Sequence, residues 1–125
     1  MITKEEVLQI HEEVLKLHGG SSELREPGAP ESAIARPYQT FGGEDLYPAY
    51  FKKGAAFSES IIMNHPFIDG NKRTGYVLME TMLRLHGYKI SAPDEELYQF
   101  VIDISTGTKR FEEIVEWLKI NSKTL

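Results

Sequence analysis

The sequence contains no cysteine, so it can form no disulfide and no thiolate metal site, and it has no cysteine nucleophile. This is compatible with a reducing cytosol. Long apolar runs are also missing: no stretch approaches the roughly 20 apolar residues of a membrane helix, and the charged N-terminal residues do not resemble a signal peptide. We therefore expect a cytoplasmic protein without a membrane partner.

Positive charge is scarce as well. The chain has 14 lysines and arginines against 19 acidic residues, and the formal net charge of −5 disfavours direct binding to nucleic acid. With 125 residues, of which 41% are hydrophobic and 26% charged, the composition is that of a globular protein, and we expect a single domain over residues 1–125. Two basic pairs are notable against this acidic background: Lys52–Lys53, which we interpret as exposed charge, and Lys72–Arg73.

Apolar residues recur mainly at helical spacing, which predicts an all-α fold, a compact bundle of about six helices. Thr3 and Glu6 form a capping-box pattern at the start of the first helix, which Gly19–Gly20 ends. Its expected apolar stripe consists of Val7, Ile10, Val14 and Leu17. Further helices are predicted over residues 31–36, where Pro37 would stop the helix, over 48–64, from 71 to Gly87, from 91–93 to before Gly107, and over 111–118.

Two segments are expected to be non-helical. Residues 39–46, with Gly42–Gly43, are predicted to be irregular or a small hairpin, and residues 88–91 a brief extended piece. For the helix from 71 we expect the inner face to be Val77, Leu78, Met82 and Leu85. His11 and His18 lie seven residues apart without a third metal ligand, so we interpret both as structural or surface residues.

The segment from His65 to Thr74 carries the chemistry that the sequence suggests. A helix is predicted to end before it and another to start at Asn71, which can cap that helix. The first N–H groups of a helix lack internal partners and lie at its positive end, so they can hold an anion. Gly70 would allow close approach to the backbone, and the side chains of Lys72, Arg73 and Thr74 add donors in the same turn.

Two further residues of this segment complete a site for phosphorus chemistry. Asp69 could hold Mg²⁺, which prefers oxygen ligands and shares its shell with phosphate oxygens. His65 can be neutral near pH 7 and could take a proton from an attacking hydroxyl. The segment thus predicts an enzyme that uses ATP for phosphoryl or nucleotidyl transfer. Arg36, at the end of a short helix, could contact phosphate or target, or could cap carbonyl groups.

The residues His65-Pro66-Phe67-x-Asp69-Gly70-Asn71-Lys72-Arg73 resemble the signature of the Fic/Doc superfamily, and of its Doc (death-on-curing) toxin branch. Residues 31–37, 41–43 and 45–48 also look like Doc-type sequence. The resemblance implies a helical bundle with the motif between two central helices and a flap near residues 39–47 that docks the target. It implies that His65 is the catalytic base, Asp69 a Mg²⁺ ligand, and Asn71 and Arg73 phosphate binders.

Lys72 distinguishes the branches, because Fic enzymes that transfer AMP usually have glycine at this position. Doc-like proteins carry lysine here. The resemblance of this sequence to them implies phosphorylation of a Ser/Thr hydroxyl of elongation factor Tu, which inhibits translation. It also implies a cognate antitoxin as partner. The alternatives are AMP transfer (AMPylation) to a protein hydroxyl and a catalytically silent module that binds nucleotide or a partner.

Overall fold

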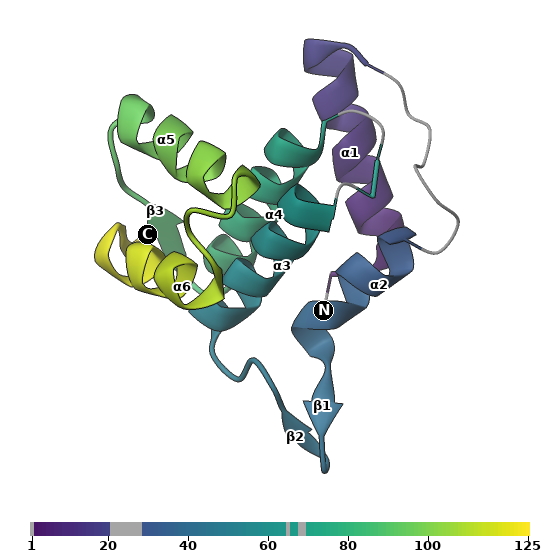
Figure 1. Ribbon diagram of the computed structural model, residues 1–125, viewed down its shortest axis with the longest axis vertical. Helices are drawn as coiled ribbons and strands as arrows, with labels where there is room; N and C mark the ends of the chain where they lie inside the picture. Colours follow the sequence, from purple (N-terminus) through teal and green to yellow (C-terminus); the bar gives the residue numbers. More distant parts are fainter. Residues whose placement is uncertain (1, 21–28, 65, 68–69) are drawn as a thin grey trace.

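The computed structural model describes residues 2–20, 29–64, 66–67 and 70–125. Helices make up most of this part of the chain, and they form a bundle, which confirms the all-α prediction (Figure 1). The helices are α1 (Lys4–His18), α2 (Ala29–Ala35), α3 (Tyr50–Asn64), α4 (Asn71–Leu85), α5 (Asp94–Ser105) and α6 (Phe111–Ile120), with a 3-10 turn η1 (Arg36–Tyr38) after α2. The strands are β1 (Thr40–Phe41), β2 (Glu44–Asp45), β3 (Tyr88–Ile90) and β4 (Ser122–Thr124).

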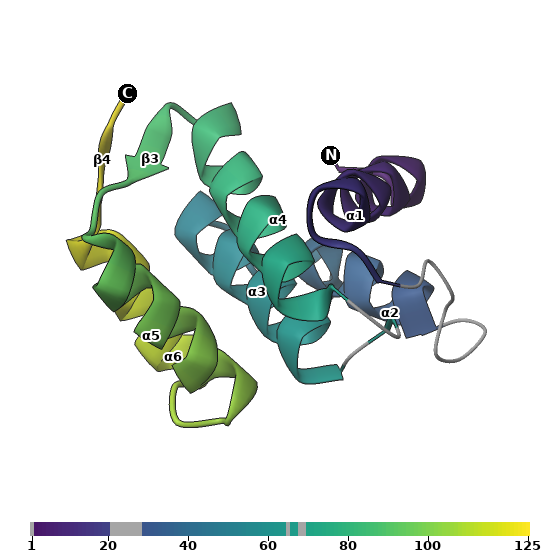
Figure 2. The same cartoon turned by 90° about the horizontal axis from the view of Figure 1, so that it is seen from above.

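Helices α3 and α4 form the centre of the bundle, with α1 and α2 on one side and α5 and α6 on the other (Figure 2). Nine consecutive residues of α3, Gly54–Ile62, are buried, because neighbours cover this helix on all sides. Apolar clusters fill both sides of the pair. One includes Ile2, Val7, Phe57, Phe67 and Leu78, and the other includes Ile62, Met79, Phe100, Ile114 and Leu118.

Helix α1 begins as the sequence predicts. The Thr3 hydroxyl accepts a hydrogen bond from the Glu6 backbone N–H, and the Glu6 carboxylate accepts one from the Thr3 N–H. The predicted stripe is wrong at its end: Leu17 is 79% exposed, because the last turn of α1 extends beyond the neighbouring helices (Figure 1). His11 is buried instead.

The inner face of α4 also differs from the prediction. Leu85 is exposed and Val77 is only half-buried, whereas Met79 and Leu83 are fully buried. The prediction gave the helix one apolar face, but α4 packs on both sides and buries a wider stripe. That stripe consists of Asn71, Thr74, Gly75, Leu78, Met79, Met82 and Leu83.

The residues before α3 form a hairpin, as predicted. Strands β1 and β2 are antiparallel, with Phe41 opposite Glu44, and Gly42 and Gly43 form the turn with positive φ angles of 60° and 83°. Lys53 anchors the hairpin to α3: its Nζ donates to Asp45 Oδ2 (2.6 Å), the Tyr47 carbonyl (2.7 Å) and the Pro37 carbonyl (3.1 Å). The interpretation of Lys53 as merely exposed charge is therefore wrong.

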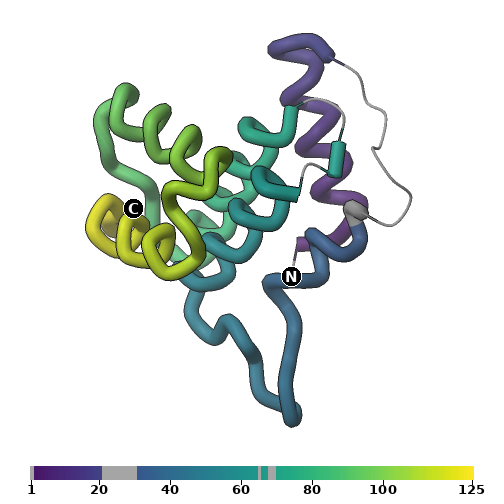
Figure 3. Tube along the Cα trace, in the orientation of Figure 1, coloured from purple at the N-terminus to yellow at the C-terminus, as the bar shows by residue number. Residues whose placement is uncertain are grey.

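The hairpin and the segment after α3 lie at opposite ends of that helix, as the chain trace shows (Figure 3). The 15 residues of α3 span about 22 Å at the usual helical rise. The hairpin is thus separated by the length of α3 from the described residues that follow that helix, and its expected role in docking the target stays a prediction.

The remaining differences are small. Pro37 does not simply stop a helix but lies within the 3-10 turn η1, and α2 begins at Ala29 rather than residue 31. The extended piece near 88–91 is β3, which pairs with a strand that the sequence did not predict, β4, with Lys89 opposite Lys123. Within the part of the chain that the structure describes, no helix has the length and apolar character needed to cross a bilayer.

Candidate phosphate-binding site at the start of α4

The side chain of Asn71 bonds to the backbone of the motif segment at Phe67. Asn71 Nδ2 donates to the Phe67 carbonyl oxygen (2.8 Å), and the Phe67 N–H donates to Asn71 Oδ1 (3.1 Å). Both polar atoms of the amide are thus used within the segment, and Asn71 is buried (8% exposed). A phosphate contact from Asn71 would come from its backbone N–H, because its side chain holds the backbone of Phe67.

Helix α4 starts one residue earlier than the predicted cap. Gly70, not Asn71, is the N-cap residue, with a left-handed φ of 80°, and as a glycine it has no side chain to cap the helix. The first intrahelical bond joins the Thr74 N–H to the Gly70 carbonyl (2.9 Å). The N–H groups of residues 71–73 therefore precede the hydrogen-bonded part of the helix and have no intrahelical partner, which is the arrangement that binds anions at helix starts.

The first turn of α4, like that of α3, contains two cations and no acidic residue. Helices α1, α5 and α6 each begin with acidic residues, which favour the positive end of a helix. Helix α4 has none there and begins with Lys72 and Arg73, both exposed. Within the described ranges, neither cation takes part in an ion pair. An anion bound at this turn would relieve the repulsion between these cations and the helix dipole.

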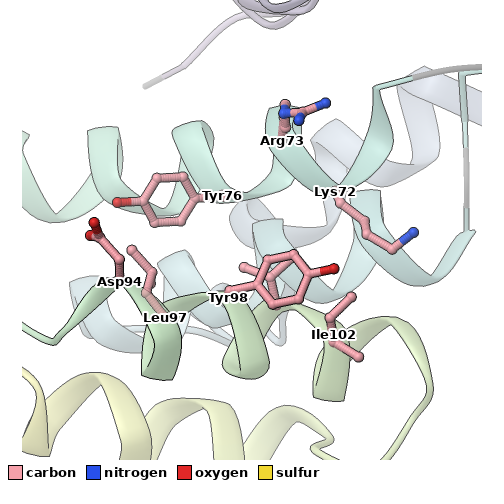
Figure 4. Close-up of a pocket in the computed structure, with 8 residues that line it drawn as sticks. Lys72, Arg73, Tyr76, Asp94, Leu97, Tyr98 and Ile102 are labelled. Atoms are coloured by element: carbon pink, nitrogen blue, oxygen red, sulfur yellow. The ribbon is translucent and has the colours of Figure 1, made fainter. Parts of the chain in front are cut away.

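A pocket adjoins this turn between α4 and α5 (Figure 4). Its volume is about 430 Å³, and it is lined by Lys72, Arg73, Tyr76, Asp94, Leu97, Tyr98, Val101 and Ile102. Burial, together with the hydrogen bond that its hydroxyl donates to Glu80, raises the pKa of Tyr76. The pocket thus combines two cations at the helix start with aromatic and aliphatic walls.

Three predicted site residues, His65, Asp69 and Thr74, do not lie among the exposed groups of this turn that the structure describes. His65 and Asp69 lie outside the described residues, so their predicted roles rest on the sequence. Thr74 is fully buried, and its hydroxyl has no hydrogen-bond partner in the described part of the chain. Because the fourth residue of α4 faces the core, this hydroxyl does not reach the surface on which Lys72 and Arg73 lie. The expectation of a phosphate contact from Thr74 is therefore not met in this structure.

Gly70 is also placed differently from the expectation. A Cβ at this position would lie 3.4 Å from Leu15 Cδ2 and 3.5 Å from two atoms of the His11 ring. The side of Gly70 that would carry a Cβ therefore faces α1 rather than a ligand. Glycine is needed here chiefly for the left-handed conformation, which other residues rarely adopt.

Arg36 is held by protein groups. Its Nη2 pairs with Glu59 Oε1 (2.9 Å), Nη1 donates to Ser60 Oγ (3.2 Å) and Nε donates to Tyr47 Oη (3.1 Å). Burial opposes its charge, but the hydrogen bonds with Tyr47 and Glu59 outweigh burial and raise the pKa of Arg36. Among the described residues, its side chain bonds to neither a helix-end carbonyl nor the start of α4, and we interpret it as a structural residue that joins η1 to α3.

A metal site is not apparent in the described ranges: no three His, Asp or Glu side chains gather there. Asp69 lies outside those ranges. The pocket residues Tyr76, Tyr98 and Asp94 were not identified from the sequence. Tyr76 could have been, because it lies one turn after Lys72 and Arg73 on the same helix. Nothing in the sequence places Asp94 and Tyr98, which belong to another helix, beside them.

Together, the fold and the site define a small helical protein with a motif segment between two central helices and, after it, a first helical turn that carries two exposed cations. The sequence pattern of the Fic/DOC family matches residues 1–83. The chain is 39% identical to "Toxin Doc" of Mycolicibacterium smegmatis over 74 residues, which are 59% of this chain and 57% of that protein. It is 25% identical to "Protein kinase doc" of Escherichia phage P1 over 118 residues, 94% and 92% of the two chains. This chain belongs to the Fic/DOC family, on its Doc branch.

Proposed function

We propose that this protein is a Doc-like toxin that transfers the γ-phosphate of ATP to a serine or threonine hydroxyl of a protein target. The observation that carries the proposal is the first turn of α4. It offers the N–H groups of residues 71–73 and two exposed cations, Lys72 and Arg73, that no carboxylate neutralises within the described residues. Phosphoryl transfer requires positioning and charge neutralisation more than covalent chemistry, and this turn supplies both.

In the proposed reaction, His65 takes the proton of the target hydroxyl. The hydroxyl oxygen forms a bond to the γ-phosphorus while the bond from phosphorus to the β–γ bridging oxygen breaks, so that ADP leaves and a phosphoester remains. The helix-start N–H groups and Arg73 hold the phosphate oxygens throughout. Asp69, which precedes Lys72 by three positions in the sequence, has the donor type that suits Mg²⁺, which would neutralise phosphate charge when bound.

We call the first turn of α4, residues 71–73, the phosphate cradle. The pocket beside this cradle supports binding of a nucleotide rather than of phosphate alone. Its volume of about 430 Å³ lies within the range of about 300–1,000 Å³ that is usual for small-molecule sites. Tyr76, Tyr98 and Leu97 supply aromatic and aliphatic surface for a nucleoside, and the Asp94 carboxylate could accept a hydrogen bond from a sugar hydroxyl or a base amino group.

The names of the two relatives describe a toxin and a protein kinase, which supports both halves of the proposal. The family resemblance points to elongation factor Tu as the target. Its phosphorylation would inhibit translation, and the reaction would take place in the cytoplasm. A cognate antitoxin, by the same resemblance, would hold the enzyme inactive until it is lost.

The test is the mass of elongation factor Tu after incubation with the protein and Mg–ATP. We expect the gain of one phosphoryl group, and a loss of about 10²–10⁴-fold in rate for His65→Ala, the usual contribution of a general base. His18→Ala is the matched control, because His18 is exposed at the end of α1. Gain of an adenylyl group would instead establish AMP transfer. No gain, with growth arrest unchanged in a folded His65→Ala variant, would favour a silent binding module.

Lys72→Gly tests the assignment to the Doc branch. We expect this variant to transfer phosphate more slowly and to gain some AMP transfer, because glycine would open space and free backbone beside the cradle. Since Lys72 is exposed, the variant should fold. Unchanged phosphate transfer, with no adenylyl product, would contradict the role given to Lys72.

A further inference from the structure

His11 lies on α1, more than fifty residues before the motif, yet its ring contacts the motif directly. The ring is buried (2% exposed) and stacks on the ring of Phe67, with centroids 3.7 Å apart and planes 10° from parallel. A stacked aromatic pair is directional, because its energy depends on how the rings overlap. His11 therefore fixes the orientation of Phe67 as well as covering it.

The same ring lies against the end of the motif segment. A Cβ on Gly70 would stand 3.5 Å from Cδ2 and Nε2 of His11, and 3.4 Å from Leu15 Cδ2. One face of α1 thus contacts both Phe67 and Gly70. These two described residues flank positions 68–69 in the sequence, and Phe67 follows His65 by two positions.

Phe67 is consequently held from two directions. The Asn71 side chain, from α4, binds its backbone N–H and carbonyl, and the His11 ring, from α1, covers its ring. The backbone contact alone leaves the segment free to tilt about the two hydrogen bonds. The ring contact removes that freedom, because Phe67 is only 1% exposed and cannot shift without losing the stack.

We propose that His11 is a positioning residue for phosphoryl transfer: it fixes Phe67 against α1 and so restrains the motif segment to which the catalytic base, His65, belongs. This inference rests on the proposed function for its effect on turnover. Its structural half, the control of Phe67 by His11, does not depend on that function.

The experiment compares His11→Ala, His11→Phe and the control His18→Ala in the full chain. The first readout is hydrogen exchange of the Phe67 N–H, which donates to Asn71. In His11→Ala we expect this exchange to accelerate about tenfold, the size of effect that loss of a buried stacked pair produces. His11→Phe retains a flat ring, and His18 is exposed, so both should leave the exchange within about twofold of the parent.

The second readout is the phosphorylation of elongation factor Tu. In His11→Ala we expect kcat to fall by about 10–100-fold, as misplacement of a reacting group by about 1 Å can do. The KM for ATP should stay within about twofold, because Lys72, Arg73 and the pocket are untouched. His11→Phe should recover most of the lost kcat. A merely structural role would not separate kcat from KM in this way.

Each other result is decisive. If the Phe67 N–H stays protected in His11→Ala, or if kcat and KM change together, the proposal is wrong. If His11→Ala loosens the whole chain, His11→Phe decides: exchange at Phe67 faster than in the parent would overturn the role of the ring. If the parent protein transfers no phosphate, the proposed function fails, while the exchange data still test whether His11 controls Phe67.

Discussion

Glu59 is a carboxylate inside the bundle, only 5% exposed, at the middle of α3. It pairs with Arg36 of η1 through Oε1 (2.9 Å) and with Arg110, at the start of α6, through Oε2 (3.1 Å). Each carboxylate oxygen thus has a cationic partner, which a buried charge requires. One residue of the central helix thereby joins segments that are 74 residues apart in the sequence, 110 minus 36.

We predict that Glu59→Gln lowers the free energy of unfolding by about 1–3 kcal/mol. The loss is smaller than for a fully buried pair, because the Arg110 side chain is 62% exposed. Urea unfolding followed by circular dichroism measures it. Glu116→Gln is the control, since Glu116 is exposed and its pair with Lys119 is 3.8 Å long; its effect should stay within about 0.5 kcal/mol. Equal effects of both substitutions would contradict the importance of the buried pair.

At the scale of elements, α4 packs tightly on α3 at Gly75. A Cβ there would stand 2.6 Å from Ile62 Cγ1 and 3.0 Å from Ile62 Cδ1. Ile62 is fully buried and cannot move aside without disturbing its own neighbours. Glycine at this position therefore sets the distance between the two helices that flank the motif.

Gly75→Ala should lower the free energy of unfolding by about 1–2 kcal/mol, because overpacking outweighs the gain in helix propensity. Gly54→Ala is the matched control on α3: its nearest neighbour would be the Met79 carbonyl at 3.6 Å, an ordinary contact. That variant should be neutral or more stable by up to about 1 kcal/mol. Thermal unfolding of both variants compares them, and a Gly75→Ala protein as stable as the parent would contradict the close approach.

The hairpin is joined to α3 by a pair that depends on pH. The hydrogen bond from Lys53, followed by that from the Tyr47 N–H, lowers the pKa of Asp45. Because the pKa of Asp45 is lower in the folded state, its ionised carboxylate stabilises the folded state above the unfolded pKa, which is about 3.9 for aspartate. This stabilisation is lost as the pH falls through the lower folded value.

We therefore predict that the amide signals of Gly42 and Gly43 shift on acidification with an apparent pKa below about 3.9. Titration by nuclear magnetic resonance measures it, and Asp45→Asn should abolish the transition. A midpoint at or above the ordinary value for aspartate would show that the Lys53 contact is not formed in solution.

At the scale of the whole molecule, two apolar clusters lie on either side of the α3–α4 pair. The motif segment contributes Phe67 to the cluster that contains α1 and α2, whereas the pocket beside the cradle is completed by α5. The candidate site is therefore supported from both halves of the bundle. The β3–β4 sheet, in contrast, lies at the end of α4 away from its first turn (Figure 2).

We predict that deletion of residues 122–125 lowers the free energy of unfolding by about 1–2 kcal/mol, because β3 loses its strand partner. The affinity for ATP should stay within about twofold, because the cradle lies a full helix length away. Chemical unfolding and calorimetric titration measure the two quantities, with Leu125→Ala as control because Leu125 is 61% exposed. A large loss of ATP affinity in the folded truncated protein would place this sheet in the binding site.

Much of this architecture is determined by local sequence. The Thr3–Glu6 capping box, the glycine pair of the hairpin and the helical spacing of apolar residues predict their elements correctly, because capping, turn conformation and amphipathicity depend on residues close together in the chain. The motif from His65 to Arg73 likewise indicates the family, since its residues are contiguous.

Only the tertiary structure decided which side chains are buried and which residues of other elements they contact. Local spacing gave α4 a single apolar face and left His11, Lys53 and Arg36 without defined partners. Their partners, Phe67, Asp45 and Glu59, come from other elements, and burial on two sides of a helix depends on how the elements pack. Contacts between distant segments arise from the packing of the whole bundle, whose free energy no local pattern contains.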